Sequence, residues 1–228
     1  MSSPKGSRWS RPTASRSASF FPRRASRASS ARWRRSASRW RASYRRNSPC
    51  GMEARMYRYF AYGSAISKRH IGEWAAEHGV DARLFARGAP AVLRGYRLVF
   101  DVESRFWAGK VADLIEDEKG AVHGVLFEIP PPAREAIFRK EGVPTGLSEE
   151  IDVTVEAEGK RIAAKAFVAR AGKRSEPGPA SGRLLAYLIE GAQERGLPQE
   201  WLDELKKQSA TPAQPAPGAV GLKIEQKR

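Results

Sequence analysis

The hydrophobic positions in the middle of the chain follow two periods, and their order predicts a domain that mixes strands and helices. The aromatic-rich segment 57–62 suits a buried strand that stops at a tight turn formed by Gly63 and Ser64. Apolar residues then recur at helical spacing, with Ser67 as a suitable N-cap and Gly79 as a suitable C′ residue. The pattern therefore predicts a strand, a loop and a helix in succession.

Three more strands are predicted downstream, because apolar and β-branched residues dominate segments 91–100, 109–115 and 121–129. The tripeptide Glu118-Lys119-Gly120 separates the last two and is interpreted as a hairpin turn. Three consecutive prolines at 130–132 then prevent the last strand from continuing.

The rest of the pattern contains both periods again. Strands outnumber helices and do not alternate regularly with them, so the expected fold class is α+β, with a mixed or closed sheet. The predicted elements are a short helix over 133–140 that ends at Glu141-Gly142, a strand pair over 151–156 and 161–168, an amphipathic helix from Ser181 to Ala192, and a final short helix opened by Pro198.

Composition divides the chain into three parts. Residues 1–51 hold 14 of the 41 Lys and Arg residues and no Asp or Glu, so most of the net charge of +16 lies there. The other 27 basic residues nearly balance the 25 acidic ones, and a basic groove is not expected in the folded region. We expect a disordered Arg/Ser-rich arm over 1–51, one domain over 52–208 and a disordered, Pro-containing tail over 209–228.

Three interpretations of the arm are open. Its Arg-rich, Ser-rich and acid-free composition is typical of an organellar transit peptide. Its arginines could instead neutralise the phosphates of a nucleic acid while Trp33, Trp40 and Tyr44 stack on unpaired bases, although no nucleic-acid-binding module is recognisable. The third and favoured hypothesis is that translation begins at Met52 or Met56, where the composition changes.

The cysteine and histidine content excludes several classes of site. Cys50 is the only cysteine, so neither an intramolecular disulfide nor a thiolate metal cluster is possible, and the spacing of His70, His78 and His123 does not indicate a metal site. No apolar run reaches the 18 residues that a transmembrane helix needs. We expect a protein without metal or membrane association, cytoplasmic unless the arm directs it to an organelle, while its oligomeric state is not indicated.

Several short motifs, taken together and in this order, resemble the γ-glutamylcyclotransferase family. No one of them is specific, but the similarity runs across nearly all of residues 56–206. The motifs are Tyr59-Phe60-Ala61-Tyr62-Gly63-Ser64, Gly109-Lys110-Val111-Ala112-Asp113-Leu114, Val122-His123-Gly124-Val125-Leu126-Phe127, Arg139-Lys140-Glu141-Gly142-Val143-Pro144, and Gly191-Ala192 followed by Gly196-Leu197-Pro198.

This resemblance implies a small mixed β-barrel with flanking helices and an enzyme that releases 5-oxoproline from a small γ-glutamyl substrate without a cofactor. In that reaction the substrate's own α-amine attacks its γ-amide carbonyl. Glu141 matches the family's catalytic glutamate, which would carry the proton from the α-amine to the leaving nitrogen. The loop Tyr62-Gly63-Ser64-Ala65 would bind the substrate through backbone N–H groups.

The sequence departs from the family at three positions. Ala65 stands where the family usually has Asn, and Ser148 and Leu184 stand where it commonly has Tyr. Loss of groups that hydrogen-bond a substrate changes specificity more than it changes the fold. Two functions therefore stay open: an active cyclotransferase with an unusual γ-glutamyl amine or peptide substrate, and a catalytically impaired homologue that binds a γ-glutamyl-like metabolite or a protein partner.

Overall fold

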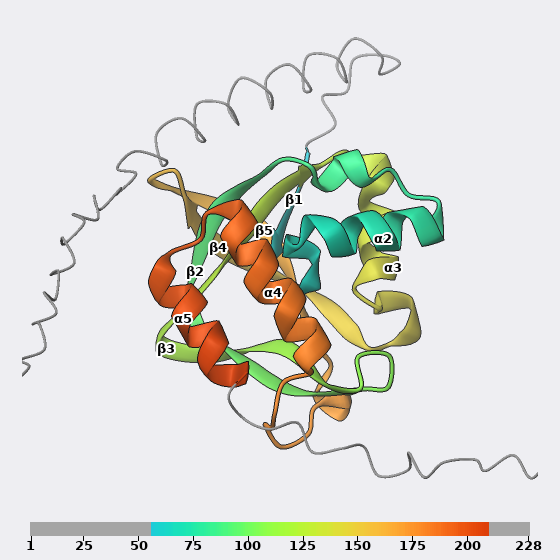
Figure 1. Cartoon of the computed structure of the whole chain (residues 1–228). Coiled ribbons are helices and arrows are strands. Elements are labelled where there is room, and N and C mark those ends of the chain that lie inside the picture. The colour runs from blue at the N-terminus through green and yellow to red at the C-terminus, as the bar shows by residue number, and fades with distance from the viewer. Residues whose placement is uncertain (1–55, 210–228) are drawn as a thin grey trace, which may run out of the picture.

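Five strands close into a barrel in the computed structural model, which describes residues 56–209 (Figure 1). Their order around the barrel is β1-β3-β2-β4-β5; β1 pairs with β5 in parallel, and the other neighbouring pairs are antiparallel. The predicted α+β fold with a small mixed barrel is confirmed. The strands are β1 (Tyr57–Ala61), β2 (Gly88–Ser104), β3 (Gly109–Ile129), β4 (Ser148–Ala157) and β5 (Lys160–Ala169).

Four α-helices flank the barrel within the described residues: α2 (Lys68–His78), α3 (Arg134–Lys140), α4 (Gly182–Arg195) and α5 (Gln199–Ser209). In Figure 1, α4 and α5 lie side by side over the barrel, and α2 and α3 lie beyond α4. The predicted N-cap of α2 is confirmed, because the Ser67 hydroxyl accepts a hydrogen bond from the His70 N–H at 3.2 Å. Ser181 caps α4 in the same way, accepting from the Leu184 N–H at 3.3 Å.

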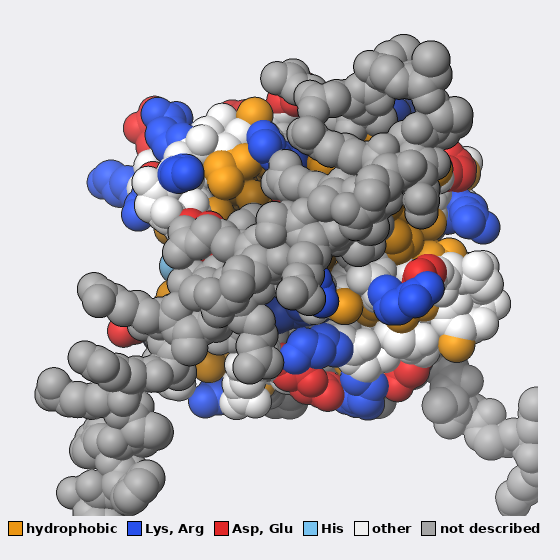
Figure 2. Space-filling model, turned by 90° about the horizontal axis from the view of Figure 1, so that it is seen from above, with side chains coloured by type: hydrophobic (Ala, Val, Ile, Leu, Met, Phe, Trp, Pro, Cys, Tyr) orange, Lys and Arg blue, Asp and Glu red, His pale blue; other side chains and the backbone are white. Residues whose placement is uncertain are grey.

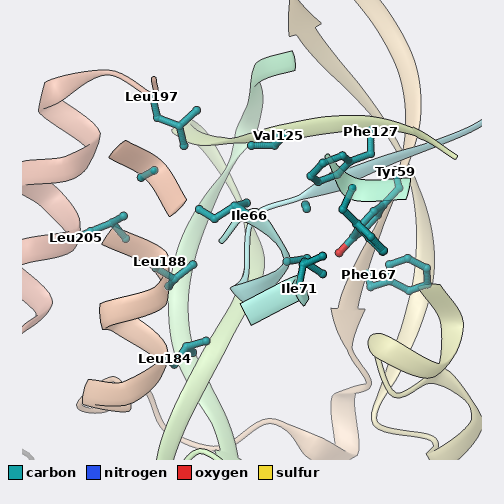
Figure 3. Packing of buried hydrophobic residues seen from close by; sticks show 14 of the residues in the cluster. Tyr59, Ile66, Ile71, Val125, Phe127, Phe167, Leu184, Leu188, Leu197 and Leu205 are labelled. Carbon is teal, nitrogen blue, oxygen red and sulfur yellow. The ribbon is translucent and has the colours of Figure 1, made fainter. Parts of the chain in front are cut away.

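Successive residues of a strand belong to two different apolar clusters, as the alternation of side chains across a sheet requires. Phe60 of β1 lies in a cluster built from strand residues, which fills the barrel interior. Tyr59 lies in the other cluster, which also contains Leu188 of α4 and Leu205 of α5 and therefore joins the barrel to its helices. Figure 3 shows Leu188 and Leu205 pointing from the helices toward Ile66 and the strands behind it.

The predicted hairpin turn at Glu118–Gly120 is wrong. β3 runs unbroken through this tripeptide, and both of its halves pair with the single long strand β2. The register shifts there, because Arg94 pairs with Ala121 whereas Tyr96 pairs with Glu116. The extra β3 residues form an irregularity opposite Gly95 of β2, whose φ is 81°. The two backbones approach so closely here that a Cβ on Gly120 would lie 2.3 Å from the Tyr96 carbonyl oxygen. Gly120 therefore allows a close approach of two strands and does not form a hairpin turn.

Charges of opposite sign lie close together on the surface of the described part. Figure 2 shows acidic and basic side chains next to one another along the visible edge of that surface. Arg69 and Glu190, for example, form an ion pair with 2.6 Å between Nη2 and Oε2. Among residues 56–209 no helix is both long and apolar enough to cross a membrane. The predicted arm and tail, except for residue 209, lie outside the described residues.

Candidate active site

A cavity of about 130 Å³ opens between the loop after β1, the end of α3 and the strands β2, β3 and β5. Part of its lining is polar and part is apolar. The polar residues are Tyr62, Ser64, Asp113, Lys140, Glu141 and Ser148, and Gly63 also lies in the lining. The apolar residues are Val102, Trp107, Val111, Ala112, Leu147, Phe167, Val168, Ala169 and Leu184.

Glu141 enters this lining because α3 ends at it. Its N–H still donates to the Ile137 carbonyl at 2.9 Å, but the next residue, Gly142, has a φ of 75° and turns the chain away from the helix axis. A side chain at Gly142 would also be crowded, since a Cβ there would lie 3.0 Å from Cδ2 of Leu147. The predicted helix end at Glu141-Gly142 is confirmed, and the left-handed glycine fixes where the glutamate points.

Tyr59 holds the carboxylate of Glu141. The phenol donates a hydrogen bond to Glu141 Oε1 at 2.6 Å, and the tyrosine is only 2% exposed. Burial raises the pKa of the Tyr59 phenol well above its ordinary value, and the negative charge of Glu141 raises it further. The phenol therefore stays protonated and remains a donor. The sequence predicts a strand at Tyr59 but no site role for it. Because side chains alternate along a strand, Tyr59 and Phe60 lie on opposite faces of the sheet.

Lys140 lines the cavity, and no site role was predicted for it from the sequence. Its ammonium group donates to the Ser64 hydroxyl at 3.0 Å and so joins the end of α3 to the loop after β1. Burial of the ammonium group lowers the pKa of Lys140, and the charge of Glu141 acts in the opposite direction. The two consecutive residues thus bring a cation and a carboxylate into one cavity.

The structure brings together all but one of the candidate site residues from the sequence. Tyr62, Gly63 and Ser64 line the cavity with Glu141. The Tyr62 phenol is committed to the fold, because it donates to the carbonyl of Phe167. Ala65 is 1% exposed and packs in the apolar cluster between barrel and helices, outside the cavity lining.

The other two departures from the family pattern do face the cavity. Ser148 is buried in the lining and donates a hydrogen bond to the backbone carbonyl of Glu141, which ties the start of β4 to the end of α3. Leu184, in the first turn of α4, is 2% exposed and contributes an apolar surface. These positions therefore shape the pocket, whereas Ala65 shapes the packing behind it.

Asp113 lies in the lining but both of its oxygens are occupied by the fold. Oδ1 accepts from the Ala169 N–H at 2.9 Å, and Oδ2 accepts from Arg174 Nε at 2.7 Å. The carboxylate is 1% exposed, so this pairing compensates a deeply buried charge. Within residues 56–209, no three His, Cys, Asp or Glu side chains gather where they could hold a metal ion.

Comparison with known proteins gives one consistent result. A family model described as the AIG2-like family matches residues 121–205. Mouse γ-glutamylcyclotransferase is 27% identical over 163 residues, which are 68% of this chain and 80% of the mouse protein. A solved structure of a γ-glutamyl cyclotransferase superposes with a TM-score of 0.58 and 25% identity, over 72% of this chain and 93% of its own. In sequence and in fold the chain is similar to γ-glutamylcyclotransferases.

A bacterial relative shows the same similarity over part of its length. A putative γ-glutamylcyclotransferase of Bacillus subtilis is 34% identical over 102 residues, which cover 45% of this chain but only 34% of that relative. The motif resemblance and the barrel fold of the γ-glutamylcyclotransferase-like family are therefore confirmed, while the roles of individual residues depend on the geometry of the cavity.

Proposed function

We propose that the protein cyclises a γ-glutamyl amine or peptide, releasing 5-oxoproline and an amine, with Glu141 as the general acid/base. The observation that carries this proposal is the position of Glu141: its carboxylate lines a cavity and is held from behind by the Tyr59 phenol. The curated relatives named γ-glutamylcyclotransferase support the same reaction class.

The reaction requires the substrate to be folded, protons to be removed from the attacking nitrogen and a proton to be delivered to the leaving nitrogen. The α-amine nitrogen forms a bond to the γ-amide carbonyl carbon, the bond from that carbon to the leaving nitrogen breaks, and a five-membered ring results. Because both reactants belong to one molecule, holding the reactive conformer can supply about 7–11 kcal/mol. A cavity lined by Tyr62, Phe167 and Leu184 is suited to confining such a conformer.

Glu141 would carry the proton between the two nitrogens. A free α-amine has a pKa of about 8, so it is largely protonated at neutral pH and must lose a proton before it attacks. The carboxylate oxygen that does not accept from Tyr59 would take this proton and then deliver it to the departing amine, while the second proton that the attacking nitrogen loses on ring closure is released to solvent. The loop at Gly63 and Ser64 would bind the substrate's α-carboxylate or the carbonyl oxygen as negative charge develops on it.

An assay for 5-oxoproline separates this function from its alternative, a catalytically impaired homologue that binds a γ-glutamyl-like ligand. The full chain is incubated with a panel of γ-glutamyl amines, γ-glutamyl dipeptides and glutathione, and 5-oxoproline is quantified. Release from at least one compound supports the enzyme. Absence of product from the whole panel, together with saturable binding of one compound, supports the impaired homologue.

A further inference from the structure

The cavity contains one cation whose charge is not neutralised by an ion pair within the described part of the chain. Lys140 is the one Lys or Arg in the described lining, and its ammonium contacts the neutral Ser64 hydroxyl at 3.0 Å. A partly dehydrated ammonium without a direct ion pair is unfavourable, and an anionic ligand that contacts it would relieve that cost.

The carboxylates of the lining are already engaged elsewhere. Asp113 accepts hydrogen bonds from Arg174 and from the Ala169 N–H, and one oxygen of Glu141 accepts from Tyr59. Glu141 is close enough to influence the charge of Lys140, yet the pair makes no direct ion pair. Lys140 is therefore available to a carboxylate brought in by the substrate.

The order of these two residues matches the groups of a γ-glutamyl substrate. The α-amine and α-carboxylate of that substrate are attached to the same carbon, so their partners must also be neighbours. Lys140 and Glu141 are consecutive, and both reach the cavity because the helix ends between them and Gly142. A carboxylate at Lys140 would bring the adjacent amine toward Glu141.

Apart from Asp113, which is paired with Arg174, the lining from β2, the turn after it, β3 and α4 is apolar. Val102, Val111, Trp107 and Leu184 supply it, and the Trp107 ring is packed against His70 with 5.1 Å between ring centroids. The nearby cation Arg183 lies over the Trp107 ring at 5.0 Å and is not part of the lining. A carboxylate placed here would lose water without gaining a cation, whereas a hydrocarbon group would be favourably buried.

We propose that the pocket selects γ-glutamyl amides that carry a single carboxylate, bound by Lys140, and an apolar leaving amine without a carboxylate of its own. This inference rests on the proposed cyclisation. γ-Glutamyl amino acids, which carry a second carboxylate on the leaving part, are correspondingly poor substrates.

A matched pair of substrates tests the selection. γ-Glutamyl-leucine and γ-glutamyl-3-methylbutylamide have the same hydrocarbon side chain and differ by one carboxylate. With the full chain, kcat/KM for 5-oxoproline release is expected to be at least about 10-fold higher for the amide. Equal values, or a preference for the leucine compound, overturn the substrate inference and leave the cyclisation standing. Failure to cyclise either compound, or any other γ-glutamyl compound, overturns both.

Two substitutions test the residues behind this selection. Lys140→Met is expected to raise KM for the amide about 10-fold or more with a smaller change in kcat, and Lys140→Arg, which keeps the charge, should restore most of the binding. Val111→Lys adds a cation to the apolar region at a half-buried position and should narrow the preference for the amide, whereas Val111→Leu should not. An unchanged KM in Lys140→Met, or an unchanged preference in Val111→Lys, contradicts the proposed charge pattern.

Discussion

The phenol of Tyr59 and the carboxylate of Glu141 are 82 positions apart in the sequence and are joined by a hydrogen bond of 2.6 Å between Oη and Oε1. This contact connects the first strand of the barrel to the end of α3. It occupies one carboxylate oxygen of Glu141, a residue of the cavity lining, and under the proposed function the other oxygen would transfer the proton.

Removing this hydrogen bond should affect catalysis more than stability. Tyr59→Phe keeps the buried ring and is expected to lower kcat about 10-fold, because the carboxylate loses its fixed orientation. The free energy of unfolding should fall by only about 1 kcal/mol. Steady-state kinetics and urea unfolding measure the two effects.

Tyr57→Phe is the matched control, because Tyr57 lies on the same strand and donates at 2.6 Å to Glu150, which does not line the cavity. It should leave kcat unchanged. A similar loss of kcat in both variants would show that Tyr59 acts only through the general integrity of β1.

The left-handed glycine after Glu141 should be needed for the position of the carboxylate. Gly142→Ala places a Cβ at a φ of 75° and 3.0 Å from Leu147, so it should cost about 1–2 kcal/mol of stability and also lower kcat. Gly146→Ala has a comparable φ of 69° with open space around the new Cβ, so it should lose stability while keeping kcat. Equal kcat values for the two variants would argue against a positioning role for Gly142.

The buried pair of Asp113 and Arg174 should respond asymmetrically to substitution. The Asp113 side chain is 1% exposed whereas that of Arg174 is 34% exposed. Substitution of Arg174 would therefore leave a charged aspartate buried without a partner, whereas substitution of Asp113 would leave an arginine that can still contact water. Arg174→Met is expected to cost about 3 kcal/mol and Asp113→Asn about 1–2 kcal/mol. Urea unfolding at pH 7 measures both values, and the opposite order would contradict the burial argument.

His70 should make the protein less stable in mild acid. Burial lowers its pKa to about 3, and the positive charges of Lys140, Arg183 and Arg69 act in the same direction. As the pH falls below about 6.5, His70 binds a proton in the unfolded chain but not in the folded chain. The contribution of the neutral, buried His70 to the free energy of unfolding is therefore fully present above about pH 6.5 and is lost progressively as the pH falls toward 3.

His70→Gln tests this effect by removing the titrating group. Between pH 6.5 and pH 5 the unfolding free energy of the wild type should fall by about 1–2 kcal/mol more than that of the variant. Urea unfolding at several pH values gives this difference. Parallel pH profiles for the two proteins would mean that His70 does not carry the acid sensitivity.

The sequence predicted local elements more completely than it predicted contacts between them. Period and capping signals identified α2, including the Ser67 cap, because these depend on neighbouring residues. The continuous β3 was missed because Gly120 serves a close approach to β2 that only the paired sheet reveals.

The candidate site shows the same division. Glu141 and the loop from Tyr62 to Ser64 were found through motif resemblance, since the motif itself contains them. Tyr59 and Lys140 lie inside the same motifs, but the motifs do not indicate a role for them. The role of each depends on a partner far away in the sequence: Glu141 is 82 positions from Tyr59, and Ser64 is 76 positions from Lys140. Ala65 was placed in the binding loop, yet its side chain packs behind the cavity.

The most direct test of the proposed function is the rate of 5-oxoproline release by the wild type and by Glu141→Gln, measured on the full chain with the best γ-glutamyl substrate of the panel. Glutamine keeps the size of the side chain and can still accept from Tyr59, but it cannot carry the proton. The account predicts that kcat falls at least about 100-fold while the unfolding midpoint stays close to that of the wild type. A variant that releases 5-oxoproline at the wild-type rate would contradict it.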